Sequence, residues 1–503
     1  MSGLEILTNA QTRAADAAAI AAGASGFDLM TRAGEAVAAA VMDRWPSGPV
    51  VVLCGPGSNG GDGFVAACAL KARGRDVRLA AMVDRSALNG DAAKAAAAWQ
   101  GPVAHLEVSL FAGAGVIVDA LFGAGLDRPL DAGLQSLLRA AAASGAPILA
   151  VDLPSGLNGD TGKPMGYAPP AAATVTFHRK KPAHVLLPGR DLCGEIIVAD
   201  IGLETPRNVT LLENGPPLWG ARMPWPTAVS HKHARGRVIV VSGDVATTGA
   251  ARLAARGALR IGAGVVTVLS PPDALIVNGA HLEAIMLRPF ETDVELEAAA
   301  ATVDAAVIGP AAGVNESTVS NLFALARTGS ALVIDADALT VFADDTEDFF
   351  SVLDRDDVLT PHPGEFERVF PGLLGGSSER ITAARKAAAR AGAVVLLKGS
   401  DTVIAAPDGR AVVNGNGSPW LATAGSGDVL TGFIAGLIAQ GLDSFDAACA
   451  AVWIHAEAGA TFGPGLISED LPGLAPQVLA RLYAASTPPQ PSGRPDRARA
   501  VRL

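Results

Sequence analysis

Short runs of Val, Ile and Leu recur along the chain, and Ala-rich stretches of helical character separate them. This alternation is typical of strand-helix-strand units, in which helices flank a buried parallel sheet. The expected strands form two series, the first at 49–54, 76–83, 115–121 and 147–153, and the second at 237–244, 264–270, 305–310, 331–337, 357–363 and 393–399. The sequence therefore predicts an α/β fold with two mainly parallel sheets.

The two series indicate two domains. A chain of 503 residues is longer than one hydrophobic core usually sustains. The stretch 203–236 holds five prolines and no sustained periodicity, so we expect the junction there. The predicted domains are 1–215 and 225–485, and the Pro- and Arg-rich segment 486–503 is expected to be a disordered tail.

Composition limits the classes of partner. The formal net charge is −11, which argues against binding to nucleic acid or to an anionic membrane, because both attract clustered Lys and Arg. The four cysteines are widely spaced, and the N-terminal stretch has neither a signal-peptide pattern nor an apolar span. We therefore expect a cytoplasmic protein that acts on small molecules. The sequence leaves open whether it forms a homo-oligomer.

Three loops of the first domain follow expected strands and carry side-chain oxygens. Asn59 and Asp62 follow the first strand, Asp119 ends another, and Asp152 and Ser155 follow the next. Ligands of parallel sheets collect at the carboxyl ends of the strands, so we expect these side chains to converge. The amide, carboxylate and hydroxyl oxygens of Asn59, Asp119 and Ser155 are the type of ligand that hard cations prefer.

The glycines of the first loop permit more than one interpretation. Gly55, Gly57 and Gly60 have the G-x-G-x-x-G spacing that brings backbone amides close to a pyrophosphate, although this spacing also occurs in purely structural turns. Asp84 stands where a hydride-transferring Rossmann domain places its ribose ligand, so a dehydrogenase is not excluded. Asp119 and Asp152 would also serve as helix caps.

The ordered set GPGSNGGDGF (55–64), VDALFGAGLDRPL (118–130) and VDLPSGLNGDTG (151–162) resembles the NAD(P)H-hydrate epimerase domain over roughly residues 1–215. The resemblance implies a Rossmann-like fold, a hydrated nicotinamide nucleotide as substrate, and K⁺ held by Asn59, Asp119 and Ser155. It implies that the nucleotide site is lined by Ser58, Asn59, Gly60, Gly61, Asp62, Gly123, Ala124, Gly125, Leu126, Asp127, Arg128 and Pro129. Asp152 would contact the nicotinamide, and we expect it to be the general acid/base. Ser58 replaces the first Asn of the family pattern, which is expected to alter affinity.

A second group of polar residues precedes an apolar helix near the C-terminus. Gly425, Ser426 and Gly427 would place unpaired amides at the helix N-terminus, where they can bind phosphate oxygens. Asp428 beside them could take a proton from a substrate hydroxyl during phosphoryl transfer, or it could simply cap the helix. This loop resembles the G-x-G-D signature of the ribokinase-like superfamily.

Segments 247–268, 308–313, 333–339, 359–366 and 396–404, together with this loop, resemble the ADP- or ATP-dependent NAD(P)H-hydrate dehydratase domain over about residues 225–485. The resemblance implies that Lys398, Gly399, Ser400, Asp401, Thr402 and Gly427 bind the adenine nucleotide. It implies that Ala250, Gly313, His362 and Asp428 contact the hydrate. Asp335 and Asp337 are candidates for helping to hold Mg²⁺. Ala311 replaces a family glycine and would restrict the backbone if a positive φ is needed there.

Together the two resemblances imply a bifunctional repair enzyme. One domain would interconvert the R and S epimers of hydrated NADH and NADPH, and Asp428 of the other would assist dehydration of the S form with ADP, releasing AMP and phosphate. ATP is the less favoured nucleotide because bacterial members of the family usually use ADP. The alternative is a sugar or vitamin kinase fused to a nucleotide-binding sensor domain, which would accumulate a phosphorylated product.

Overall fold

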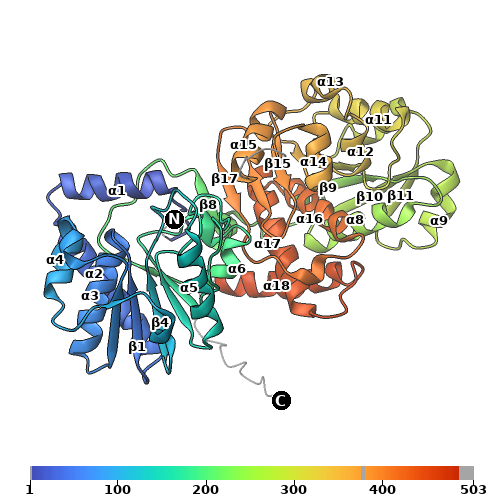
Figure 1. The fold of residues 1–503 in the computed structure, drawn as a ribbon. Helices are drawn as coiled ribbons and strands as arrows, with labels where there is room; N and C mark the ends of the chain where they lie inside the picture. Colours follow the sequence, from blue (N-terminus) through green and yellow to red (C-terminus); the bar gives the residue numbers. More distant parts are fainter. Residues whose placement is uncertain (1–2, 375–379, 487–503) are drawn as a thin grey trace, which may run out of the picture.

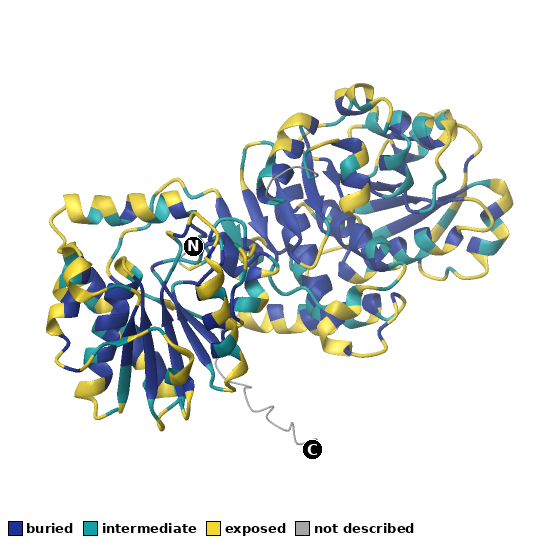
Figure 2. Ribbon diagram, in the orientation of Figure 1, coloured by how far each residue is buried: buried dark blue, intermediate teal, exposed yellow. Residues whose placement is uncertain are grey.

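The computed structural model describes residues 3–374 and 380–486. The tail expected at 486–503 lies outside the described residues, apart from Ser486. Two α/β units lie side by side, each built on one sheet with helices packed against it (Figure 1). Most strands are buried and the outward faces of the helices are exposed, as Figure 2 shows. The predicted fold class is therefore confirmed.

The first unit contains a seven-stranded sheet in which every pairing is parallel, in the order β3-β2-β1-β4-β5-β6-β7. Its strands are β1 (Val50–Cys54), β2 (Val77–Ala81), β3 (Ala104–His105), β4 (Val116–Ala120), β5 (Ile148–Val151), β6 (Ala173–Phe177) and β7 (Glu195–Ala199). The central β1 is buried on both faces, which is why it reads as a continuous apolar run.

Helices cover both faces of this sheet. Val50, Val52 and Cys54 pack toward α2, α3 and α4, whereas Val51 and Leu53 pack toward α5, as the two-residue period of a strand requires. The helices are α1 (Asn9–Ala21), α2 (Gly26–Arg44), α3 (Ser58–Ala72), α4 (Gly90–Ala98), α5 (Ala132–Ala143) and α6 (Gly189–Cys193), with the 3-10 helices η1 (Arg85–Ala87), η2 (Val108–Phe111) and η3 (Pro182–His184).

The second unit contains a ten-stranded sheet in the order β11-β10-β9-β12-β13-β14-β15-β16-β17-β8. All pairings are parallel except those of β16 with β15 and with β17. The strands are β8 (Leu211–Glu213), β9 (Arg237–Val241), β10 (Val265–Ser270), β11 (Met286–Pro289), β12 (Ala305–Ile308), β13 (Ala331–Ile334), β14 (Val358–Leu359), β15 (Val394–Leu397), β16 (Val403–Ala405) and β17 (Ala411–Val413). Strand β8 lies within the range 1–215 expected for the first domain, but it pairs with β17 of the second sheet.

The helices of the second unit are α7 (Pro216–Trp219), α8 (Thr248–Ile261), α9 (Leu275–Gly279), α10 (Asp293–Ala300), α11 (Glu316–Ala326), α12 (Asp337–Thr340), α13 (Thr346–Ser351), α14 (Pro363–Val369), α15 (Arg380–Ala391), α16 (Ser426–Ala439), α17 (Ser444–Phe462) and α18 (Leu471–Ser486), with η4 (Gly220–Arg222), η5 (Lys232–Arg235), η6 (Pro272–Ala274) and η7 (Pro419–Leu421). In the described parts of the chain, no helix is both long and apolar enough to cross a membrane.

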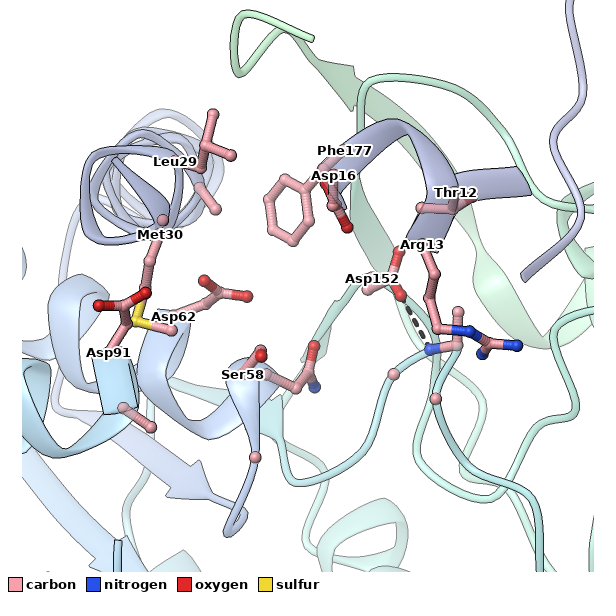
Figure 3. Close-up of a pocket in the computed structure, with 18 of the residues that line it drawn as sticks. Thr12, Arg13, Asp16, Leu29, Met30, Ser58, Asp62, Asp91, Asp152 and Phe177 are labelled. Carbon is pink, nitrogen blue, oxygen red and sulfur yellow. Dashed lines mark hydrogen bonds between the residues drawn. The ribbon is translucent and has the colours of Figure 1, made fainter. Parts of the chain in front are cut away.

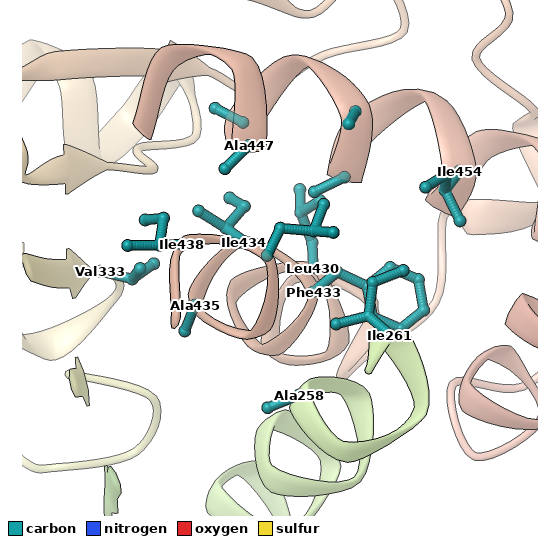
Figure 4. Close-up of a cluster of buried hydrophobic side chains, with 14 of the residues drawn as sticks. Ala258, Ile261, Val333, Leu430, Phe433, Ile434, Ala435, Ile438, Ala447 and Ile454 are labelled. Atoms are coloured by element: carbon teal, nitrogen blue, oxygen red, sulfur yellow. The ribbon is translucent and has the colours of Figure 1, made fainter. Parts of the chain in front are cut away.

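Helix α16 is buried on nearly all sides and lies in the hydrophobic core of the second unit. Its side chains pack against α8 and α17 in one apolar cluster (Figure 4). A Cβ on Gly432 would lie 2.0 Å from the carbonyl oxygen of Ala254, so only glycine permits α8 to approach this closely. This packing fixes the N-terminus of α16, and with it Asp428.

Two short segments of the first unit contact the second. Residues 4–7 hydrogen-bond to both β8 and Lys180, and Lys180 also pairs with Glu213 at 2.7 Å. Farther along, the backbone N–H of Leu187 donates to Asp401 at 3.0 Å, and Arg190 donates to the carbonyl oxygens of residues 400 and 415. The segment that follows β6 therefore contacts the second unit directly.

Candidate active sites

The first candidate site lies at the carboxyl ends of β1, β4 and β5, where the strand order reverses. Connections that leave β1 and β4 toward opposite faces open a crevice at such a point. The structure has a cavity of about 820 Å³ there. Of the residues predicted to bind the nucleotide, those that line it are Ser58, Asn59, Asp62, Gly123, Ala124, Gly125, Leu126 and Asp152.

The other predicted residues of this site lie elsewhere. Gly60 and Gly61 are buried within α3, and a Cβ on Gly60 would lie 1.9 Å from the carbonyl oxygen of Gly55. Glycine is needed there for the close approach of the helix to the end of β1. Asp127, Arg128 and Pro129 are exposed and do not line the cavity.

Asp152 follows β5 and its carboxylate faces the cavity (Figure 3). Its Oδ2 accepts a hydrogen bond from the backbone N–H of Ala124 at 2.8 Å, and its Oδ1 lies 2.7 Å from Lys181 Nζ and 3.1 Å from Thr176 Oγ1. The φ angle of Asp152 is 65°, a left-handed conformation that is uncommon outside glycine and that persists only where the surroundings impose it. The structure thus fixes the direction of this carboxylate.

Lys181 and His184 complete the network around Asp152, and the sequence analysis did not identify either residue. The Lys181 side chain is 1% exposed. Burial opposes ionisation of Asp152, but the Lys181 ammonium outweighs it and holds the pKa of Asp152 below its usual value. His184 Nδ1 accepts from the backbone N–H of Lys181, so Nε2 carries the ring proton and donates to the Asp152 carbonyl oxygen at 2.9 Å. Burial lowers the pKa of His184 to about 4, which keeps it neutral.

The expected cation ligands lie together beneath the cavity wall. Ser155 Oγ donates to Asp119 Oδ1 at 2.6 Å, and Phe122, the next wall residue, donates its N–H to the same Oγ at 2.9 Å. A Cβ on Gly123 would lie 2.9 Å from Asn59 Oδ1 and 2.8 Å from Asp152 Oδ2, so Asn59 reaches the same stretch of backbone. The structure therefore brings Asn59, Asp119 and Ser155 around residues 122–123.

These three residues fit a cation chemically. Asp119 is 1% exposed, and among residues 3–374 and 380–486 no Lys, Arg or His forms an ion pair with it. Burial raises the pKa of Asp119, and hydrogen bonds from Ser155 and Leu121 limit the rise. Asn59 contributes its amide oxygen, because a Cβ on Gly123 would lie 2.9 Å from Asn59 Oδ1. A hard monovalent cation would supply the missing charge to this oxygen-rich set.

Besides Asp152, the carboxyl groups of Asp16, Asp62 and Asp91 line the cavity. Asp62 projects from α3 and Asp16 from α1, and both are labelled in Figure 3. Burial raises the pKa of Asp62 well above its usual value, and the charges of Asp152 and Asp16 add to the rise. For Asp16, burial raises the pKa, Lys181 opposes the rise and Asp152 adds to it. Asp16 was missed from the sequence because it lies in an Ala-rich helix far from any strand end.

The second candidate site lies at the N-terminus of α16. Gly425 has φ 85° and precedes the helix, so the amides of its first turn point outward. Lys398, which follows β15, places Nζ 2.7 Å from Asp335 Oδ1 at the end of β13. A Cβ on Gly427 would lie 3.5 Å from Lys398 Nζ and 3.6 Å from Asp335 Oδ2. Residues from three elements therefore converge on this turn.

Asp428 stands in a different electrostatic setting from Asp152. Burial and the charge of Asp335 raise the pKa of Asp428 to about 6, and Lys398 only partly offsets them. Lys398 itself is engaged by Asp335 and Glu365, which outweigh burial and raise its pKa. Asp428 is thus a carboxyl group that gains and loses a proton close to neutral pH, as a general base requires.

His455 on α17 holds the first turn of α16, and the sequence analysis did not identify this residue. Its Nε2 lies 3.0 Å from the carbonyl oxygen of Ser426. A carbonyl only accepts, so Nε2 carries the proton. Burial lowers the pKa of His455 to about 4, so the ring is neutral. His455 therefore fixes the turn without adding charge to the anion site.

Several residues predicted for the second site have structural contacts. His362 caps α14, because its Nδ1 accepts from the backbone N–H groups of Gly364 and Glu365, and its Nε2 lies 3.3 Å from a Glu365 carboxylate oxygen. Both ring nitrogens are thus engaged, which argues against its use as a base. Asp401 accepts from Leu187 and pairs with Arg380 at 3.2 Å.

The remaining predicted residues form turns near the site. Thr402 bonds to Gly399 in both directions, and Ser400 is exposed between them. Ala250 lies in the first turn of α8. Gly313, with φ 85°, donates its N–H to Asp337 at 2.9 Å, so this candidate magnesium ligand is already engaged, as is Asp335. Across the described residues, no group of three or more His, Cys, Asp and Glu forms a metal cluster.

Ala311 adopts a φ of 55°, so the position does need the left-handed backbone that a glycine would favour. Its carbonyl oxygen accepts from Thr247 Oγ1 at 3.2 Å. A Cβ on Gly243 would lie 1.9 Å from that same oxygen. The substitution is therefore accommodated in a tightly packed loop at the cost of backbone strain.

Comparison with known proteins assigns both units. A family model described as YjeF-related protein N-terminus matches residues 26–183, and one described as NAD(P)H-hydrate dehydratase matches residues 238–469. A ribokinase-like superfamily protein from Enterococcus faecalis V583 shares the fold of the second unit, with a TM-score of 0.50 and 23% identity over 56% of this chain and 99% of that one.

Curated relatives match nearly the whole chain. The bifunctional NAD(P)H-hydrate repair enzyme of Coxiella burnetii is 36% identical, covering 90% of this chain and 93% of the relative. The enzyme of the same name from Escherichia coli K12 is 34% identical, covering 88% of each chain. With both domains matched in the same order, the chain belongs to the family of bifunctional NAD(P)H-hydrate repair enzymes, which join an epimerase domain to a dehydratase domain.

Proposed function

We propose that the 820 Å³ cavity of the first unit inverts the hydroxyl-bearing ring carbon of hydrated NADH and NADPH, with Asp152 as general base. The observation that carries this assignment is the convergence of Asp152, Lys181 and the amide of Ala124 at the cavity wall. Lys181 keeps Asp152 ionised, and Ala124 fixes one of its oxygens. The carboxylate can then take a proton from a water that attacks the ring.

Potassium is the cation that we assign to Asn59, Asp119 and Ser155. Bound there, it would supply a positive charge close to the nucleotide phosphates. The buried Asp119 carboxylate supports this assignment, because it has no cationic partner among residues 3–374 and 380–486. Ser155 and Phe122 would keep the wall of the cavity in position around it.

In the second unit, we assign phosphoryl transfer from ADP to the hydroxyl of the S hydrate. Asp428 takes the hydroxyl proton, the hydroxyl oxygen bonds to the β-phosphorus, and AMP leaves. The new phosphate then departs with the carbon-oxygen bonding electrons, and loss of a proton from the neighbouring carbon restores reduced nicotinamide. The amides of Gly425 to Gly427 and the Lys398 ammonium would hold the phosphates. Mg²⁺ would be held mainly by those phosphates, because Asp335 is paired with Lys398.

The reaction would take place in the reducing cytoplasm, which the four free cysteines favour. The test is to incubate the purified protein with mixed hydrate epimers and either ADP or ATP, and to follow recovery of nicotinamide absorbance. Full recovery supports both assignments. In Asp152→Ala, inversion should stop while dehydration of the S epimer continues. Accumulation of a phosphorylated product without cofactor recovery would instead indicate a small-molecule kinase.

A further inference from the structure

Inversion of the ring carbon requires both a proton donor and a proton acceptor, and one ionised carboxylate supplies only the acceptor. The hydroxyl leaves with the bonding electron pair and must receive a proton, while the lone pair of the ring nitrogen forms a C=N bond. Water then adds to the opposite face of this flat cation and must lose a proton. One proton is delivered and one is removed, with no oxidation or reduction, so the cavity needs an acid as well as a base.

Asp152 begins the inversion as the base, because its pKa is lowered. Its Oδ1 is engaged by the Lys181 ammonium, and its Oδ2 accepts from Ala124. Lys181 is in turn held by Thr176 Oγ1 at 2.8 Å and is almost fully buried, so its contact with Asp152 is shielded from solvent. The acid must therefore be another group in the same cavity.

Three other carboxyl groups line the cavity, and their contacts distinguish them. Asp91 is paired with Lys94 at 2.8 Å. The positive charge of Lys181 limits the rise that burial causes in the pKa of Asp16 on α1. Asp62 on α3 is 7% exposed, and within the described residues it has neither an ion-pair partner nor a side-chain hydrogen bond. Asp62 is thus the carboxyl group with the least support for a negative charge.

The direction of Asp62 also suits an acid. Figure 3 shows its carboxyl group reaching from α3 into the space that separates it from Asp152. Burial first, and then the charges of Asp152 and Asp16, raise the pKa of Asp62. Arg13 and Asp91 line the same cavity, and burial raises the pKa of the nearby Cys54 thiol, which is neutral. Burial and the charges of Asp152 and Asp16 therefore favour the protonated form of Asp62.

We propose that Asp62 is a second catalytic residue of the first cavity, the acid that protonates the departing hydroxyl while Asp152 removes the proton from the incoming water. This inference rests on the proposed epimerase function of the cavity. After one inversion Asp62 is ionised and Asp152 is protonated, and a proton passing between them through water resets the site. In the reverse direction the same cycle inverts the other epimer.

The test uses the full-length protein, one purified hydrate epimer and water enriched in ¹⁸O, without ADP. The wild type should incorporate solvent oxygen into the hydroxyl each time it inverts the carbon. Asp62→Asn keeps the shape of the neutral side chain but has no acidic proton, so inversion and oxygen exchange should both fall by roughly 10²–10⁴-fold in kcat. KM for the hydrate should change little, and dehydration by the second unit should stay at its wild-type rate.

Two further variants separate catalysis from folding. Asp43→Asn removes an exposed carboxylate of α2 that does not line the cavity, and its inversion rate should stay within about twofold of the wild type. Asp16→Asn removes one of the charges that raise the pKa of Asp62. The decline of wild-type inversion at high pH, where Asp62 loses its proton, should therefore move to lower pH in Asp16→Asn.

The outcomes of these experiments distinguish the inference about Asp62 from the proposed epimerase function of the first cavity. If the wild type does not interconvert the epimers, the proposed function of the first cavity is wrong. If the wild type inverts the carbon and Asp62→Asn retains more than about a third of that rate, the inference about Asp62 is wrong and the function stands. Inversion without ¹⁸O incorporation, or an unchanged high-pH decline in Asp16→Asn, would also overturn it.

Discussion

Each unit contains a lysine that lies 2.7 Å from an aspartate following a strand, yet the two pairs have opposite effects on the carboxylates assigned to catalysis. In the first unit the lysine pairs with the assigned carboxylate itself, and Asp152 is held ionised. In the second unit Lys398 pairs with Asp335, and Asp428 beside them is left with a pKa of about 6. The partner that the lysine takes decides which carboxylate can exchange a proton near neutral pH.

The difference matches the chemistry assigned to each unit. A base that takes a proton from water during rapid inversion must be ionised at the start, and a permanent ammonium neighbour ensures this. In the second unit the base takes a hydroxyl proton next to the incoming phosphates. Lys398 is not paired with this base, so its ammonium group can contact the phosphates. In this assignment the lysine of the first unit is the partner of the base, and the lysine of the second unit would contact the phosphates.

The largest effect should come from Asp428→Asn. Without a base for the substrate hydroxyl, kcat for dehydration should fall by roughly 10²–10⁴-fold, while epimer inversion is unchanged. Cofactor recovery from the pure S epimer with ADP measures the first, and chromatography of the epimers measures the second. Asp408→Asn, at an exposed carboxylate paired with Arg410, is the control and should leave both rates unchanged. Loss of inversion in Asp428→Asn would show that the two sites do not act separately.

Lys181→Met should lower the free energy of unfolding by about 3–5 kcal/mol, because it leaves the buried Asp152 carboxylate without its partner. Lys180→Met is the matched control. It removes the neighbouring lysine, whose pair with Glu213 is more exposed, and should cost about 1 kcal/mol or less. Urea unfolding of both variants measures the difference. Equal losses would mean that the Lys181 pair contributes no more than a surface contact.

The pH dependence of the two reactions should differ. Dehydration needs ionised Asp428, so its kcat should rise through pH 6, level off above it, and at pH 5 be about a tenth of the plateau. Inversion should show no such change near pH 6, because the pKa of Asp152 is lowered. Buffers spanning pH 5 to 8 with saturating substrates provide the measurement. A shared decline below pH 6 would contradict the comparison.

The raised pKa of Asp428 also determines how the stability of the protein changes with pH. Because the folded-state pKa of Asp428 lies above its unfolded value, the folded state binds more protons between about pH 4 and pH 6, and stability is lost as the pH rises through that range. Asp428→Asn should therefore be more stable than the wild type at pH 7, on the order of 1 kcal/mol, and no more stable at pH 3.5.

The smallest effect is expected from Ala311→Gly. The φ of 55° is strained for alanine, and relief of that strain is only partly offset by the greater freedom of glycine in the unfolded chain. The variant should gain roughly 0.5–1 kcal/mol in unfolding free energy, with dehydration kinetics close to the wild type. A loss of stability, measured by urea unfolding, would mean that the Cβ makes contacts that outweigh the strain.

The central strands could be predicted from the sequence, and the edges could not. β1 and β12 are continuous apolar runs because both of their faces are buried, and β4 and β9 are apolar apart from Asp119 and Arg237. β8, β16 and β17 have three residues each, and β8 lies inside the Pro-rich stretch expected to be a junction. Strands this short carry too little periodicity to be recognised without their partners.

The same division holds for the first site. Asn59, Asp119, Asp152 and Ser155 follow predicted strands, so parallel topology alone brought them together. Lys181 follows β6, which the sequence analysis did not predict, and lies among basic residues that resemble a solvated surface run. Its burial depends on the fold of the segment after β6 and on contacts with Asp152, which no local pattern encodes.

The pairing of β8 with β17 determines where this chain can be divided. A fragment starting at residue 225 would lack β8 and leave the hydrogen-bonding groups of β17 open along the sheet edge, which invites aggregation. The complementary fragment 1–215 would keep an apolar strand with no sheet to join. A fragment that begins a few residues before Leu211 keeps β17 covered and loses the short contact of residues 4–6 with β8, so the dehydratase half alone should aggregate less when it carries this strand.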